Sequence, residues 1–167
     1  MENKLRRGRN TKLNRHTLET KKDKAQIILF GDLHGGHPTC LWDEAQAMLD
    51  YCLENKLYVL CMGDMIECGI TGSVGDSIYT QTLNPQRQME EVIELLKPLA
   101  EKGLILGLHS GNHEDRIFKT TGVNVGKNMA GWLGVPFLHS ACWNLFRVGN
   151  QNYTMYSLHG ASGSKFI

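Results

Sequence analysis

The sequence predicts an α/β domain in which parallel strands carry polar side chains to one edge of a sheet. Three short apolar runs, at residues 25–30, 57–62 and 104–108, are each followed within three residues by a glycine and then an acidic or amide side chain. Buried parallel strands form such continuous apolar runs, and α/β proteins keep their sites at the carboxyl ends of these strands. The fold class and the position of the site follow from these runs.

Length and composition favour a single domain. The chain has 167 residues, of which 41% are hydrophobic, and this is enough for one buried core. The five cysteines are odd in number and form no Cys-x-x-Cys pair, which favours free thiols in a reducing compartment. No segment approaches the roughly 18 apolar residues of a membrane span, and no signal peptide is evident. We therefore expect a cytoplasmic protein.

Charge divides the chain into a basic N-terminus and an acidic body. Residues 1–24 hold nine lysines and arginines against three acids, whereas residues 25–167 hold nine against fourteen. Such a basic segment with few apolar residues is typical of a disordered, solvated arm. The same charge would suit contact with nucleic acid or another polyanion. We expect a disordered arm at 1–24 and a folded domain at 25–167, and composition leaves both roles of the arm open.

The first apolar run, 25–30, is expected to be a buried strand that ends at Gly31. In an extended segment, residues i and i+2 point to the same side. Asp32 and His34 should therefore converge on one point while Leu33 turns toward the core. A carboxylate oxygen with an imidazole nitrogen suits a divalent transition metal.

A helix and a second strand follow. Residues 40–56 place apolar side chains close to a 3.6-residue period, which predicts an amphipathic helix packed on the sheet. The run at 57–62 predicts a strand that leaves Asp64 at its end, as the first strand leaves Asp32. The glycine-containing segment 68–84 is expected to be a long loop beside the site.

The third strand, 104–108, is preceded by a helix, for which Asn84 is the expected N-cap and Pro85 the first turn. Asn112 and His113 follow this strand.

The remainder of the chain predicts two helices and a hairpin. The helices are expected at 115–121 and 125–133, with Gly122 and Gly134 as stops. The apolar runs 142–148 and 153–158 flank turn residues and predict a β-hairpin, and this hairpin ends beside His159.

Four short motifs, each after a predicted strand, resemble those of the calcineurin-like metallophosphoesterase superfamily. In chain order they are Gly31-Asp32-Leu33-His34, Gly63-Asp64, Gly111-Asn112-His113-Glu114 and His159-Gly160. The segments 63–67 and 111–116 are similar to those of small phosphoesterases of phage and bacterial origin. The resemblance implies a four-layer α-β-β-α sandwich of two mixed sheets.

The resemblance also implies a dinuclear metal centre. Asp32 and His34 would hold one metal, and Asp64 would bridge both metals. Asn112 and His159 would hold the second metal. Manganese is the expected metal, with iron, zinc, nickel or magnesium as alternatives.

The implied reaction is hydrolysis of a phosphate ester, with a phosphodiester favoured, by a metal-bridging hydroxide. Two divalent ions about 3.5–4 Å apart can hold such a hydroxide and orient the phosphate for in-line attack. His113 would assist the leaving group. Arg116 would add a bidentate phosphate contact, or would instead form a salt bridge to Glu114 or Asp115.

One family motif has no counterpart in this sequence. A Gly-His-x-His motif normally follows the lone histidine in the family, and nothing after Gly160 matches it. Each expected metal therefore lacks one protein ligand, and we expect a fold that is incomplete at its C-terminus. The chain is then a fragment of a longer protein or a naturally shortened form.

Two alternative functions stay open. The basic arm favours a nuclease that acts on DNA or RNA. The missing motif instead favours a non-catalytic binding or assembly module that retains the fold. No membrane partner is expected, and the oligomeric state is open.

Overall fold

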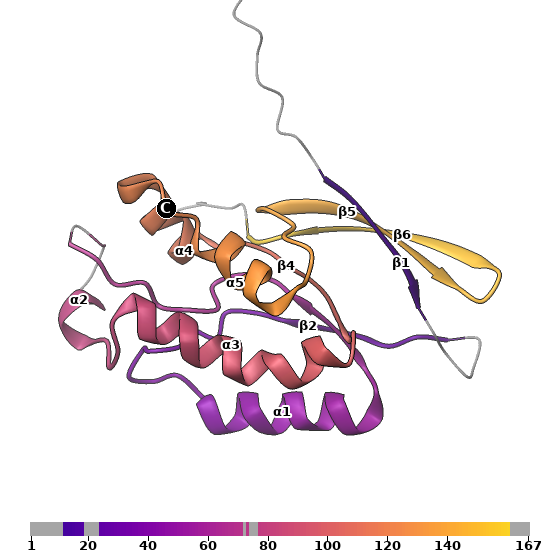
Figure 1. The fold of residues 1–167 in the computed structure, drawn as a ribbon, viewed down its shortest axis with the longest axis horizontal. Helices are drawn as coiled ribbons and strands as arrows, with labels where there is room; N and C mark the ends of the chain where they lie inside the picture. Colours follow the sequence, from indigo (N-terminus) through magenta and orange to yellow (C-terminus); the bar gives the residue numbers. More distant parts are fainter. Residues whose placement is uncertain (1–11, 19–23, 72, 74–76, 161–167) are drawn as a thin grey trace, which may run out of the picture.

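Two three-stranded sheets pack against each other in the computed structural model, which describes residues 12–18, 24–71, 73 and 77–160 (Figure 1). One sheet is parallel and has the order β2-β3-β4, formed by Ile27–Phe30, Tyr58–Cys61 and Ile105–Leu108. The other has the order β1-β5-β6, formed by Lys12–Leu18, Ala141–Val148 and Gln151–Leu158.

The described residues also form five helices. They are α1 (Trp42–Asn55), α2 (Ser77–Thr80), α3 (Pro85–Glu101), α4 (Asn112–Thr121) and α5 (Val125–Leu133). Figure 1 shows α1 and α3 side by side on the β2-β3-β4 sheet, and the β1-β5-β6 sheet lies on the other side of it. None of the described helices combines the length and apolar character needed to cross a membrane.

The core is divided by the parallel sheet into two parts. Buried side chains of α1, α3 and α5 pack on one face of this sheet, where Val59 and Ile105 point toward the helices. The neighbouring residues in each strand point the other way, so that Leu60 and Leu106 pack between the sheets with Phe146 of β5. The side chains of a strand alternate between its two faces, and this alternation explains the two apolar layers.

Most of the predicted elements are present. The three parallel strands, α1, α3, α5 and the β5-β6 hairpin form where the apolar patterns placed them. Helix α4 begins at Asn112, three residues before its predicted start, and α2 lies within the segment that was expected to be a loop. Asn84 caps α3, and its side chain accepts a hydrogen bond from Arg87 N at 3.0 Å. Gly122 and Gly134 end α4 and α5 in the left-handed conformation, as predicted.

The N-terminal segment differs from the expected arm. Residues 12–18 form β1, which pairs in parallel with β5, so the prediction of disorder is wrong for these seven residues. Leu18 is buried between the sheets, and Asn14 donates to Leu106 O at 3.2 Å and to Asn144 Oδ1 at 3.3 Å. Residues 1–11 and 19–23 lie outside the described residues.

The expected sandwich is present in its α/β character and its two sheets. The β1-β5-β6 sheet is mixed, but all described strand pairs of β2-β3-β4 are parallel, so the mixed character holds for one sheet only. In the described part of the chain, no helix covers the outer face of the β1-β5-β6 sheet (Figure 1). The fourth layer therefore stays a prediction.

Candidate metal centre

The ends of β2, β3, β4 and β6 meet at one edge of the two sheets. Asp32 lies just after β2, Asp64 after β3, Asn112 at the start of α4 after β4, and His159 directly after β6. The loop after β2 follows the loop after β3 through backbone hydrogen bonds of 3.0 Å, from Asp32 N to Gly63 O and from His34 N to Asp64 O. These contacts fix the backbone that carries the expected ligands.

The loop after β2, which carries Asp32 and His34, is not extended. The convergence of these two side chains was predicted from an extended segment. The φ angles are +53° at Asp32, +50° at His34 and +49° at Asp64, all in the left-handed region. Non-glycine residues in strained conformations cost about 1–3 kcal/mol each and persist where the surrounding structure over-determines them. The side chains still converge, but the loop geometry brings them together rather than strand alternation. Leu33 is buried in the core, as predicted.

Two glycines allow the strand ends to approach closely. A Cβ atom at Gly111 would lie 2.1 Å from Asp64 Oδ1, and one at Gly63 would lie 2.7 Å from Gly111 N. Both positions therefore exclude a side chain. The glycines of the Gly-Asp and Gly-Asn-His-Glu motifs are required by the contact between the two loops.

The buried side chain of Glu114 connects these two loops through hydrogen bonds. Its carboxylate is 1% exposed and accepts hydrogen bonds from the backbone N–H groups of Gly111, Asp64, Met65 and Ile66 at 2.7–3.2 Å. Burial raises the pKa of the Glu114 carboxyl, and backbone hydrogen bonds oppose that rise. Glu114 therefore lies inside the site and not on the surface.

The Asp64 carboxylate is the centre of the site. It is 3% exposed, and its Oδ1 accepts a hydrogen bond from His113 N at 2.8 Å, at the N-terminus of α4. The other oxygen, Oδ2, faces three imidazoles. It lies 3.3 Å from His159 Nε2 and 4.0 Å from both His34 Nε2 and His113 Nε2.

The other ring nitrogen of each imidazole is held by an acceptor. His34 Nδ1 lies 3.1 Å from Glu67 Oε2, His113 Nδ1 lies 2.7 Å from Glu67 O, and His159 Nδ1 lies 2.9 Å from Met62 O. Because carbonyl and carboxylate oxygens only accept, each Nδ1 carries the proton. When a ring is neutral, its Nε2 lone pair then faces Asp64.

The donor set fits divalent metal ions. The Nε2 atoms of three imidazoles converge on a carboxylate oxygen, and His159 Nε2 also lies 3.1 Å from Asn112 Oδ1. Acceptors at such distances repel one another unless a cation or additional protons lie between them. Nitrogen and oxygen ligands of this kind suit divalent transition metals, and Nδ1 hydrogen bonds commonly orient metal-binding histidines.

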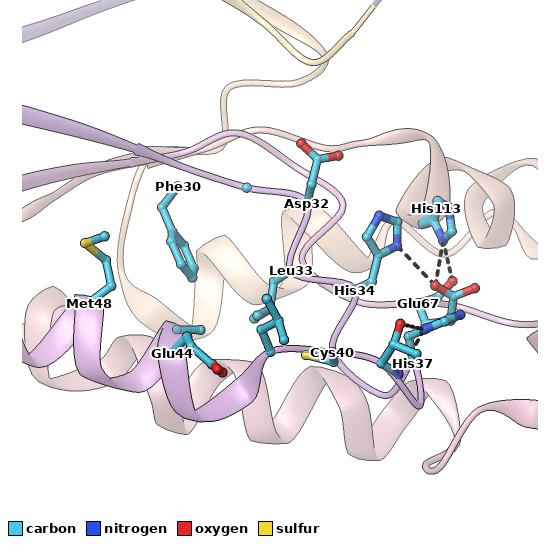
Figure 2. Close-up of a pocket in the computed structure, with 14 residues that line it drawn as sticks. Phe30, Asp32, Leu33, His34, His37, Cys40, Glu44, Met48, Glu67 and His113 are labelled. Carbon is cyan, nitrogen blue, oxygen red and sulfur yellow. Dashed lines mark hydrogen bonds and ion pairs between the residues drawn. The ribbon is translucent and has the colours of Figure 1, made fainter.

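Potential ligand atoms form two overlapping groups. Those of Asp32, His34 and Asp64 lie within 4.8 Å of one another, and so do those of His34, Glu67 and His113. Figure 2 shows the second group, with dashed lines from Glu67 to both rings, at one end of a pocket of about 660 Å³. Glu67 is buried and contacts both rings from inside the site.

The comparison with protein families agrees with this geometry. The family described as calcineurin-like phosphoesterase matches residues 25–164. The chain belongs to this family. Among curated proteins, no match is found. Calcineurin-like phosphoesterases are hydrolases that act on phosphate esters and typically use divalent metals, and the carboxylates and imidazoles around Asp64 are suitable ligands.

Arg116 lies beside the family motif without the expected salt bridge. Its Nη1 donates to Glu67 O and to Ser73 Oγ, both at 3.4 Å. The Glu114 carboxylate is occupied by backbone N–H groups, and Asp115 Oδ1 accepts a hydrogen bond from Ser110 Oγ. In the described part of the chain no ion pair joins Arg116 to Glu114 or Asp115. The phosphate contact remains a prediction.

Two supporting groups were not found from the sequence. Met62 holds His159 through its backbone carbonyl, for which a side-chain pattern carries no signal. Gln88 is buried in α3 and accepts from Cys68 N at 2.9 Å while it donates to Leu83 O at 2.7 Å. Its position could have indicated this role, because Gln88 lies four residues before Val92 and therefore on the apolar stripe of α3.

Proposed function

We propose that this calcineurin-like phosphoesterase hydrolyses a phosphodiester with two divalent metal ions, manganese first among them. The observation that supports this most is the set of three imidazoles around Asp64 Oδ2, each with its Nδ1 held by an acceptor. Such oriented imidazoles around a buried carboxylate have no evident structural purpose, because an apolar cluster would stabilise the fold without burying polar groups.

The ligands would divide between two ions. Asp32 and His34 would hold one ion with Asp64, and Asn112 and His159 would hold the other with the same carboxylate. When bound, the ions would activate a water molecule at neutral pH and neutralise charge on the phosphate. The backbone bonds to Gly63 O and Asp64 O would keep the first pair of ligands in position.

His113 and Arg116 would act on the substrate. The bond from His113 Nδ1 to Glu67 O fixes the ring, so its Nε2, once protonated, can donate to the oxygen of the leaving group. The contacts of Arg116 at 3.4 Å are long for N–H···O hydrogen bonds. Its guanidinium would therefore lose little by turning toward a phosphate oxygen.

The direct test is hydrolysis of bis-p-nitrophenyl phosphate and of p-nitrophenyl phosphate with added Mn²⁺, together with metal analysis by mass spectrometry. We expect about two ions per chain and faster cleavage of the diester. Asp64→Asn should lose both ions and the activity, whereas Asp43→Asn, at an exposed position on α1, should lose neither. Two bound ions without cleavage of either ester would contradict the enzymatic function, whereas a chain that binds no metal would favour a binding module.

A further inference from the structure

The two ligands that would belong to the second metal alone come from different sheets. Asn112 follows β4 of the parallel sheet, whereas His159 follows β6 of the other sheet. Their side chains nevertheless meet, because Asn112 Oδ1 lies 3.1 Å from His159 Nε2. In the described part of the chain, no strand pairing joins β4 to β6. Other contacts must therefore set the distance between these two strand ends.

The ligands of the first metal differ in this respect. Asp32 and Asp64 follow β2 and β3, which are neighbours in one sheet. Backbone hydrogen bonds of 3.0 Å, to Gly63 O and Asp64 O, join their two loops. The first set of ligands is therefore held by the backbone of a single sheet, whereas the second set spans both sheets.

A hydrogen bond between buried side chains connects β4 and β6 just before the ligands of the second metal. His109 lies three residues before Asn112, and Ser157 lies two residues before His159. His109 Nε2 lies 2.7 Å from Ser157 Oγ. The exposed fraction is 0% for His109 and 4% for Ser157. The contact is internal, so it does not depend on an exposed surface of either sheet.

The direction of this hydrogen bond follows from the neighbouring groups. His109 Nδ1 lies 3.0 Å from His139 O, which only accepts, so Nδ1 carries the proton and Nε2 of the neutral ring is an acceptor. Asn144 Nδ2 donates to Ser157 Oγ at 2.7 Å. The hydroxyl of Ser157 can then donate its own proton to His109. The bonds form a continuous chain from β5 through β6 to the end of β4.

We propose that His109 and Ser157 are positioning residues for the second metal. Their hydrogen bond would fix the end of β6 relative to the end of β4, and would so hold His159 and Asn112 at the separation that one ion requires. Removal of groups that orient metal ligands commonly lowers metal affinity 10–100-fold. This pair acts through the backbone of the ligands, so we expect the lower end of that range. The inference rests on the proposed dinuclear centre.

The test is titration of the full chain with Mn²⁺, in which isothermal titration calorimetry resolves the two binding steps. Ser157→Ala should weaken the second step about tenfold and leave the first unchanged, because only the second set of ligands spans both sheets. Electron paramagnetic resonance is an independent readout, because a coupled pair of Mn²⁺ ions and a single ion have different spectra. At the Mn²⁺ concentration that just fills both wild-type sites, Ser157→Ala should show mainly the single-ion spectrum.

Ile105→Val controls for a general loss of stability. Ile105 is buried at the start of β4, whereas the site lies at the other end of this strand. The substitution should cost about 0.5–1.5 kcal/mol of stability, yet both binding steps should stay as in the wild type. An unchanged second step in Ser157→Ala, or equal weakening of both steps, would overturn the proposal.

A second pair of variants covers the case in which Ser157→Ala fails to fold by circular dichroism. His109→Gln and His109→Leu both lose the bond to His139 O, but only the glutamine amide can still bond to Ser157 Oγ. His109→Gln should therefore bind the second ion more tightly than His109→Leu. Equal affinities for the second ion would contradict the proposal.

The outcomes separate the positioning role from the proposed function. A wild type that binds two ions but cleaves neither ester would contradict the phosphoesterase proposal, and the comparison of Ser157→Ala with Ile105→Val would still decide the positioning role. A wild type that binds fewer than two ions would contradict both. Two ions and hydrolysis, with a second step that Ser157→Ala does not change, would contradict the positioning role alone.

Discussion

Asn112 and His113 are neighbours in the chain but face Asp64 in different ways. Asn112 Oδ1 lies beside His159 Nε2, whereas His113 is held by Glu67 through its Nδ1. We expect Asn112→Ala to lower occupancy of the second metal. His113→Ala should leave metal content largely intact and lower turnover by about 100-fold or more, as expected for loss of a general acid.

Metal analysis and diester hydrolysis on the same preparations measure both effects. His37→Ala is the control, because His37 lines the pocket but its Nδ1 lies 2.9 Å from Thr39 Oγ1, away from Asp64. Equal loss of metal in the Asn112 and His113 variants would show that the two residues have the same role.

Gly111 gives a prediction about stability at the same scale. Gly111→Ala would place a Cβ atom 2.1 Å from Asp64 Oδ1, and overpacking of this kind costs about 1–3 kcal/mol. The loops must separate to relieve it, so metal affinity should fall as well. Urea denaturation and metal titration measure the two effects.

Gly131→Ala is the matched control for this variant. Gly131 lies inside α5, and a Cβ atom there meets nothing within 4 Å. The helix should therefore gain up to about 1 kcal/mol. A stable Gly111→Ala variant with normal metal affinity would contradict the close-approach explanation.

At the scale of elements, α3 holds the loop beside the site in place through the hydrogen bonds of Gln88. Gln88→Leu would leave Cys68 N and Leu83 O without the partners that the glutamine provides. Unsatisfied buried groups cost about 1–3 kcal/mol each, so we expect a loss of that order in the free energy of unfolding. Hydrogen exchange should rise at Cys68. Gln86→Leu, exposed on the same helix, should change stability by less than about 0.5 kcal/mol.

Elements whose signal is local could be predicted, and those that depend on distant contacts could not. The apolar runs predict the parallel strands. The apolar period and the cap at Asn84 predict α3. The strand β1 was missed because its basic residues pair with β5, more than 120 positions away in the chain. At the site, the motif residues were placed at the correct strand ends, but the left-handed backbone of Asp32 and His34 results from hydrogen bonds to another loop. No local pattern encodes those bonds.

At the scale of the whole molecule, His109 links the two sheets and makes stability depend on pH. It is fully buried at the end of β4, and its Nε2 lies 2.7 Å from Ser157 Oγ of β6. Burial lowers the pKa of His109 below the usual 6.5, and the hydrogen bond to His139 O opposes this. The unfolded chain therefore binds a proton more readily than the folded chain.

The sign of the effect follows from this difference in proton affinity. The contribution of His109 to the free energy of unfolding is fully present above about pH 6.5. This contribution is lost as the pH falls toward the lower pKa of the folded state. His16 contributes in the same direction, because burial also lowers its pKa. Urea denaturation in EDTA between pH 8 and pH 5 should show a shallower decline for His109→Gln than for the wild type. Parallel curves would mean that His109 does not cause the dependence.

Metal binding should also stabilise the whole molecule, because the ligands come together only in the folded chain. The proposed ligands lie after β2, β3, β4 and β6, so one bound centre would connect strand ends of both sheets. A ligand at 100 times its Kd stabilises the folded state by about 2.7 kcal/mol. Added Mn²⁺ should therefore raise the Tm of the wild type and have no effect on Asp64→Asn. Differential scanning calorimetry measures this, and an equal rise in both proteins would place the stabilising metal away from Asp64.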